Sequence, residues 1–114
     1  GDIYTTAENG ESGGQPPVNS PDGVAVDGSG NVLIADTGDN QIRVVAATTG
    51  TFYGQAMTAG RLYVVAGNGK PGQQGDGGPA TTARLQAPSA VTVDGAGDMV
   101  IADTGNNRVR LVTG

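Results

Sequence analysis

Short segments in which hydrophobic and polar residues alternate recur along the chain, and Val, Ile and Thr fill many of their positions. Alternation with a period of two, bounded by Gly, Asn and Asp, is typical of β-strands. β-branched side chains also pack well on a pleated sheet and are stiff in a helix. The pattern predicts strands at 3–7, 24–27, 32–36, 41–46, 62–66, 91–94, 99–103 and 108–112. The sequence therefore predicts an all-β protein.

An internal repeat organises these strands. Residues 21–45 and 88–112, offset by 67 positions, are identical at 14 of 25 positions without a gap. A second pair of similar segments, 1–10 and 60–69, is offset by 59 positions, so the connection that follows is eight residues longer in the second copy. Internal repetition of this kind indicates an architecture built from stacked supersecondary units.

The repeat contains four strands, and the chain begins with a strand of the fourth type. Four-stranded antiparallel units repeated in sequence are typical of β-propeller blades. In this interpretation 1–114 form one two-blade unit: 21–66 are a complete four-stranded blade, 67–87 are an inter-blade loop, and 88–114 are three strands of a second blade. The segment 1–10 is then an outer strand that completes the blade of a neighbouring chain.

The outer faces of two blades cannot both be covered in a monomer, so the chain is expected to close a ring by oligomerisation, as a dimer, trimer or tetramer with four, six or eight blades. The third strand of the second blade presents an unpaired edge, which is a template for another strand. The expected inter-chain pairing joins Ile3, Tyr4 and Thr5 to Arg108, Val109, Arg110 and Leu111.

The segment GDGGPATTARLQAPSAVTVDGAGDMVIADTGNNRVRLV at 75–112, with its shorter counterpart at 21–45, resembles the NHL repeat. The phrase AGNG…GDGGPATTARL at 66–85 is similar to the connection between blades in many bacterial NHL proteins. The resemblance implies a β-propeller, favours six blades and hence a trimer of two-blade chains, and favours an extracellular bacterial location. It does not specify an activity, because NHL propellers include scaffolds, ligand-binding ectodomains and some lyases.

Composition and charge exclude several kinds of chemistry. The chain has no His and no Cys, which removes imidazole bases, thiolate nucleophiles and the usual zinc ligands. A net charge of −5 provides no basic surface for phosphates and argues against a nucleic acid partner. No apolar run approaches the ~20 residues of a membrane span. We therefore predict no catalytic residues, no metal site, no cofactor and no membrane insertion.

Repeated polar residues at strand ends are candidates for structural or binding roles. Asp36 and Asp103 end the second strands in the phrase ADTG, where a carboxylate is expected to cap the following turn by accepting its backbone N–H groups; the alternative is a ring of carboxylates that holds a cation. Up-and-down connectivity places the loops after the second and fourth strands on one rim. The candidate binding rim consists of Asp39, Asn40, Asp76, Asn106 and Asn107.

Other motifs favour structure over chemistry. The turns DGSGN and DGAGD, at 27–31 and 94–98, have the residues of hairpin turns and lack the length of an EF-hand loop. The glycine-rich segment 67–85 lacks the G-K-[ST] order of a phosphate loop, so Pro79 is expected at the first position of a helical turn, with Asp76 or a glycine near the cap and Leu85 buried. Arg43 and Arg110 are expected to reach over a neighbouring blade or pair with a carboxylate there.

The sequence thus predicts a non-enzymatic propeller that assembles with itself and serves as a structural or binding scaffold for an unspecified protein or small molecule. One alternative is part of a propeller lyase or lactonase-like enzyme. Another is a ligand- or sugar-binding propeller, which requires an exposed aromatic platform; Phe52 and Tyr53 could provide one or could pack against the sheet edge.

Overall fold

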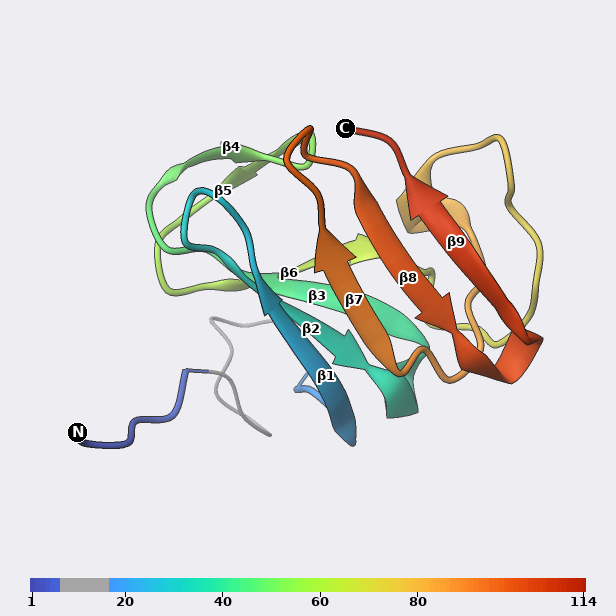
Figure 1. Ribbon diagram of the computed structural model, residues 1–114, viewed down its shortest axis with the longest axis horizontal. Helices are drawn as coiled ribbons and strands as arrows, with labels where there is room; N and C mark the ends of the chain where they lie inside the picture. The colour runs from blue at the N-terminus through green and yellow to red at the C-terminus, as the bar shows by residue number, and fades with distance from the viewer. Residues whose placement is uncertain (7–16) are drawn as a thin grey trace.

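The computed structural model describes residues 1–6 and 17–114. In this part of the chain the strands form two antiparallel sheets and one small hairpin (Figure 1). The first sheet has the order β1-β2-β3-β6, with β1 at Pro21–Val26, β2 at Val32–Asp36, β3 at Gln41–Val45 and β6 at Leu62–Ala66. The second has the order β7-β8-β9, with β7 at Ala90–Val93, β8 at Met99–Asp103 and β9 at Arg108–Val112. This all-β architecture of propeller blades confirms the predicted fold class.

Strand boundaries differ from the prediction by a few residues at most. β1 begins at Pro21 rather than 24 and ends at Val26, because Asp27 turns the chain. β3 ends at Val45 and β7 covers Ala90–Val93. The segment 47–60, expected to be a loop, instead contains the hairpin formed by β4, Gly50–Phe52, and β5, Gln55–Met57. Its tip is made by Tyr53 and Gly54, both at positive φ, a combination favoured in tight hairpin turns.

The predicted strand at 3–7 is not a strand in the isolated chain. Residues 1–6 have no regular structure, and Ile3 and Tyr4 are 96% and 83% exposed. Residue 7 of this range, and residues 7–10 of the segment predicted to be donated, lie outside the described residues. No strand within the described ranges pairs with the second edge of β9.

The main hydrophobic core lies between the two sheets. β1 and β7 are side by side in Figure 1 and pack against each other. Leu33, Ala35, Ile42 and Val44 of the first blade and Val91, Met99 and Ile101 of the second form one buried cluster. Because side chains alternate across a strand, the residues between them face outward, away from this core. On the far face of the first blade, Ile34, Val45 and Leu62 form a second, smaller cluster with Val18.

Three 3₁₀ turns connect the strands in the part of the chain that the structure describes. η1, Thr37–Asp39, and η3, Thr104–Asn106, follow β2 and β8, and each ends in a left-handed Asn, Asn40 or Asn107. η2, Ala80–Thr82, lies in the inter-blade loop. Pro79 is its N-cap rather than its first helical residue, because Pro79 has extended backbone with ψ 137°. Leu85 is buried, as predicted.

Candidate functional site

A buried carboxylate closes the β2/β3 hairpin of the first blade. Asp36 Oδ2 lies 3.2 Å from Nη1 of Arg43, and both side chains are almost completely buried. Asp36 Oδ1 accepts a 2.8 Å hydrogen bond from the backbone N–H of Asn19. The carboxylate therefore joins the segment that enters the blade to its second and third strands.

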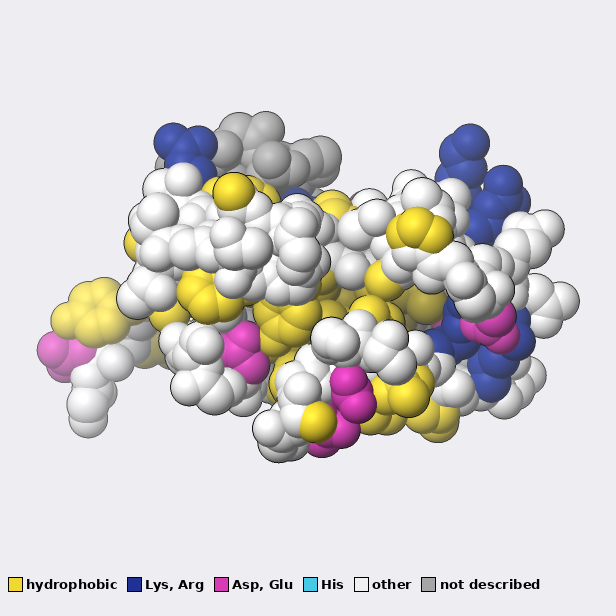
Figure 2. All heavy atoms as spheres, turned by 90° about the horizontal axis from the view of Figure 1, so that it is seen from above, with side chains coloured by type: hydrophobic (Ala, Val, Ile, Leu, Met, Phe, Trp, Pro, Cys, Tyr) yellow, Lys and Arg dark blue, Asp and Glu magenta, His cyan; other side chains and the backbone are white. Residues whose placement is uncertain are grey.

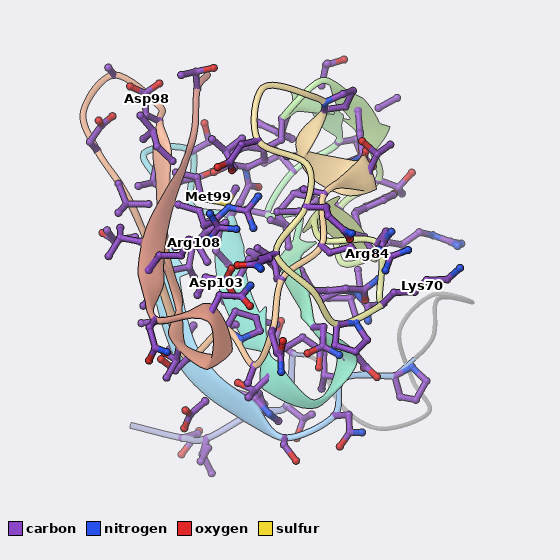
Figure 3. The ribbon with its side chains drawn as sticks, turned by 90° about the vertical axis from the view of Figure 1, so that its right-hand side faces the viewer. Lys70, Arg84, Asp98, Met99, Asp103 and Arg108 are labelled. Atoms are coloured by element: carbon purple, nitrogen blue, oxygen red, sulfur yellow. The ribbon has the colours of Figure 1, made fainter. Side chains whose placement is uncertain are left out.

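The second blade repeats this arrangement. Asp103 Oδ2 lies 3.2 Å from Arg110 Nη1, and Asp103 Oδ1 accepts a 2.7 Å bond from the backbone N–H of Gln86. The backbone N–H of Gly105 also donates to the Gln86 carbonyl oxygen at 2.7 Å. Figure 3 shows Asp103 at the end of its hairpin, where β8 turns toward β9.

These contacts correct two predictions. Asp36 and Asp103 make no side-chain cap to the turns that follow them. Instead, the Oδ1 atom of each accepts a backbone N–H from a residue 17 positions upstream. Arg43 and Arg110 pair with a carboxylate of their own blade. Arg43 stands opposite Ile34 of β2, and Asp36 lies two residues further along β2, so Arg43 and Asp36 are on the same face of the sheet. Arg110 is also held from the inter-blade loop, by Asp76 at 2.8 Å and the Arg84 carbonyl oxygen at 2.8 Å.

The two sites differ at the upstream residue, Asn19 or Gln86, and at the third residue after the carboxylate. Asn106 donates from Nδ2 to Asp103 Oδ2 at 2.7 Å, whereas its counterpart in the first repeat is Asp39, a second carboxyl group. Burial raises the pKa of Asp36 to about 6, and the hydrogen bond and negative charge of Asp39 add to this rise against the opposing effects of Asn19 and Arg43. The first site therefore holds a carboxyl group whose pKa is raised.

The structure brings most residues of the candidate rim into contact with the inter-blade loop. Asn40 Oδ1 accepts a 3.0 Å bond from the backbone N–H of Ala87, and Asn106 Nδ2 donates to the Gly72 carbonyl oxygen at 2.6 Å. Asp76 pairs with Arg108 at 3.6 Å as well as with Arg110. In Figure 3, Lys70 and Arg84 extend outward from this loop. Asn40, Asp76 and Asn106 thus have structural partners, and Asp76 and Asn107 are the exposed members of the set.

An open groove of about 1080 Å³ lies at the opposite rim, which the sequence reasoning did not favour as a binding face. Figure 2 looks onto this end and shows hydrophobic side chains at the floor of a hollow between polar surfaces. The groove is bounded by the turns after β1 and β7, the tip of the β4/β5 hairpin and the chain after β9; its lining includes Asp27, Phe52, Tyr53, Asp94 and Met99. In the sequence, the adjacent aromatic residues Phe52 and Tyr53 were the feature that could have indicated this groove.

A hydrogen bond from Tyr53 joins the tip of the hairpin to the turn after β1. Tyr53 Oη donates to Asp27 Oδ2 at 2.6 Å, and Asp27 Oδ1 accepts the backbone N–H groups of Ser29 and Asn31 at 2.9 Å each. Burial raises the pKa of Asp27, but bonds from Tyr53, Asn31 and Ser29 outweigh it and leave that pKa below its usual value. Asp94 Oδ1 accepts the N–H groups of Ala96 and Asp98 in the same way, which confirms both segments as hairpin turns.

Within residues 1–6 and 17–114, no three Asp or Glu side chains gather in a way that could hold a metal ion. The described part of the chain also contains no helix with the length and hydrophobicity to cross a membrane.

The fold and its repeated Asp–Arg sites define two blades of an NHL-type β-propeller. The sequence profile of the teneurin NHL domain matches residues 11–113, and the chain belongs to this family. Human teneurin-1 is 29% identical over 100 residues and mouse teneurin-1 is 28% identical over 100 residues. Each match covers 79% of this chain and 3% of the relative, so the chain spans a small part of those proteins.

Comparison with solved structures supports the same fold. An auxiliary nutrient binding protein from Bacteroides thetaiotaomicron superposes with a TM-score of 0.61 and 20% sequence identity. The match covers 96% of this chain and 26% of that protein. At this level of identity the likeness concerns the fold.

Proposed function

We propose that this chain is a non-enzymatic NHL scaffold that assembles with itself into a closed six-bladed ring of three chains. The observation that carries the proposal is the exposure of large hydrophobic side chains on opposite outer faces of the two blades. Val24 and Val26 on β1 are 67% and 65% exposed, and Val109 and Leu111 on β9 are 70% and 60% exposed. Exposed apolar surface of this kind marks an interaction site.

Strand exchange supports the closure of the ring. The edge of β9, Arg108–Val112, offers unpaired backbone groups, while Ile3, Tyr4 and Thr5 are exposed in the isolated chain. Addition of the N-terminal segment of one chain to β9 of the next would complete a four-stranded blade like the first, whose fourth strand, β6, has a similar sequence. Heterologous contacts under a three-fold axis leave no free edge.

The relationship to teneurins supports a binding or structural role, and the absence of His and Cys from the sequence supports a role without catalysis. We also propose that the protein works outside the cell, as the family resemblance favours. Its net charge of −5 argues against a nucleic acid partner, because nucleic acid phosphates are also negative.

Light scattering coupled to size-exclusion chromatography tests the assembly. We expect a mass three times the 11.2 kDa of the chain. Deletion of residues 1–7 should abolish assembly, because it removes the donated strand. A stable monomer at micromolar concentration would overturn the proposal, and a truncated chain that keeps the full-length mass would overturn the strand exchange.

A second candidate function is small-molecule binding in the groove beneath the β4/β5 hairpin. The observation that favours it is the combination of Phe52, Tyr53 and the Asp27 carboxylate at a concave surface, and the similar Bacteroides thetaiotaomicron structure is described as a nutrient binding protein. Titration with glucose, galactose and mannose, followed by tyrosine fluorescence, tests it. Saturable binding that is lost in Phe52→Ala would support a sugar site, and no change with any of the three sugars would count against it.

A further inference from the structure

The contact between the two blades includes two polar links besides its hydrophobic core. Thr37 Oγ1 donates to the carbonyl oxygen of Pro88 at 2.6 Å. Asn40 Oδ1 accepts the backbone N–H of Ala87 at 3.0 Å. Ala87 and Asn40 both have left-handed backbone, with φ of 47° and 57°. The two links join the turn that follows β2 to the segment that enters the next blade.

Each group in these links has a counterpart 67 residues away. Thr104 and Asn107 correspond to Thr37 and Asn40, and Pro21 and Ser20 correspond to Pro88 and Ala87. Ser20 and Asn107 share the unusual backbone of their counterparts, with φ of 53° and 55°. The chain therefore contains both halves of a second pair of links: a turn with the Thr and Asn side chains, and an entering segment with the matching backbone groups in the matching conformation.

Within the described residues these counterparts are not joined to each other. Asn107, Thr104, Ser20 and Pro21 are all exposed. Thr104 is instead close to Ser89 Oγ at 2.5 Å in its own blade. Thr104 and Asn107 lie on the second blade and Ser20 and Pro21 on the first, so the two halves of the link are presented on opposite sides of the molecule.

The apolar residues follow the same correspondence. Ile42 and Val44 of β3, which are fully buried against the second blade, correspond to the exposed Val109 and Leu111 of β9. Val91 and Val93 of β7, which face the first blade, correspond to the exposed Val24 and Val26 of β1. Each exposed surface thus repeats one half of a contact that the chain already makes inside itself.

We propose that a second copy of the chain docks its β1 face on the β9 face of the first, reproducing the inter-blade contact. In this arrangement Thr104 donates to the Pro21 carbonyl oxygen of the next copy and Asn107 accepts its Ser20 N–H. The inference rests on the proposed ring and specifies its seam: the contact is head to tail, and Asn107 belongs to the rim because it joins two copies. The occupant is a second copy because the exposed surfaces match each other, residue by residue, at one offset.

Single-cysteine variants test the seam, since the chain has no cysteine of its own. Thr104→Cys and Pro21→Cys proteins are mixed, allowed to exchange subunits, and treated with a short bis-maleimide. We expect a cross-linked dimer in the mixture and only single chains from either variant alone. Pro21→Cys is replaced by Ser29→Cys as a matched control, because Ser29 is exposed beyond the other end of β1. A Thr37→Cys/Pro88→Cys double variant shows how efficiently this spacing reacts inside one chain.

The outcomes separate the seam from the ring. No cross-linking in a mixture whose light scattering still gives a trimer would overturn the link between Thr104 and Pro21 and leave the three-chain assembly standing. A Thr104→Cys dimer formed by that variant alone would overturn it in favour of a two-fold contact. A monomer would overturn both proposals. Asn107→Gly, which keeps the left-handed backbone of this position, should weaken association by about 3- to 10-fold per seam without changing the monomer fold, as expected for one lost hydrogen bond.

Discussion

Arg43 and Asp36 stand on the same face of adjacent strands, 3.2 Å apart and out of contact with water. The first blade is thus held by a buried ion pair near the point where β2 turns toward β3. Charges in such a place are costly to desolvate, and the hydrogen bond from the backbone N–H of Asn19 to the carboxylate helps to offset that cost.

Removal of the arginine should therefore destabilise the protein strongly. Arg43→Met keeps most of the side-chain volume but leaves Asp36 buried without its cation, and we expect a loss of about 3–5 kcal/mol in the free energy of unfolding at pH 7. Lys70→Met, which removes one positive charge from an exposed loop, should change it by less than about 0.5 kcal/mol. Urea titration measures both. Equal midpoints for the two variants would show that the ion pair contributes nothing.

The raised pKa of Asp36 predicts a pH dependence of stability. Its value of about 6 in the folded state lies above the 3.8 of a free aspartate, so the folded state binds the proton more tightly. The stability from this group is complete below about pH 4 and is lost as the pH rises through about 6. Asp36→Asn should lack this contribution. The difference in unfolding free energy between wild type and variant, measured at pH 4, 5, 6 and 7, should therefore fall with rising pH.

The second repeat suggests a substitution that should lower the raised pKa of Asp36. Asp39→Asn places at the first site the amide that Asn106 provides at the second. The pKa of Asp36 should fall, because a hydrogen-bond donor replaces a like charge, and stability at pH 7 should rise. Carboxyl chemical shifts followed by NMR during a pH titration measure the first effect, and urea titration the second. An unchanged Asp36 pKa would show that Asp39 has no part in it.

The blades could be predicted from sequence because strand period and repeat offset act along the chain. β2, β6, β8 and β9 fall at the expected positions. The β4/β5 hairpin was missed because its strands have three residues each, too few to show alternation. The partners of Asp36 and Asp103 were missed for a different reason: Asn19 and Gln86 reach them through backbone N–H groups, which carry no sequence signal.

The close approach of the two blades depends on a glycine. A Cβ at Gly23 would lie 2.6 Å from the Ser89 carbonyl oxygen and 3.0 Å from the Ala90 Cα, both backbone atoms that cannot move aside cheaply. Gly23→Ala should cost about 1–3 kcal/mol, as overpacking does. Gly28→Ala is the matched control, because its Cβ would meet nothing within 4 Å. Thermal unfolding of the two variants compares them, and equal melting temperatures would contradict the packing argument.

The bond between Tyr53 and Asp27 is the basis of the last prediction, which concerns the β4/β5 hairpin. Tyr53→Phe removes the 2.6 Å bond to Asp27 but keeps the ring that packs against the core. We expect a cost of about 1.5–3 kcal/mol, the range for a hydrogen bond to a charged group, and a rise in the pKa of Asp27, because Tyr53 helps to hold it down. Since a lowered carboxyl pKa contributes stability that is lost as the pH falls, the variant should also lose less of its stability on acidification.

Tyr4→Phe changes the same atom at an exposed position and serves as the control. Faster exchange of the amide hydrogens of β4 and β5 in Tyr53→Phe would show that this bond holds the hairpin over the groove. Unchanged exchange would show that other contacts hold it, such as packing of Phe52 and the 2.7 Å bond from Gln55 Nε2 to the Val64 carbonyl oxygen.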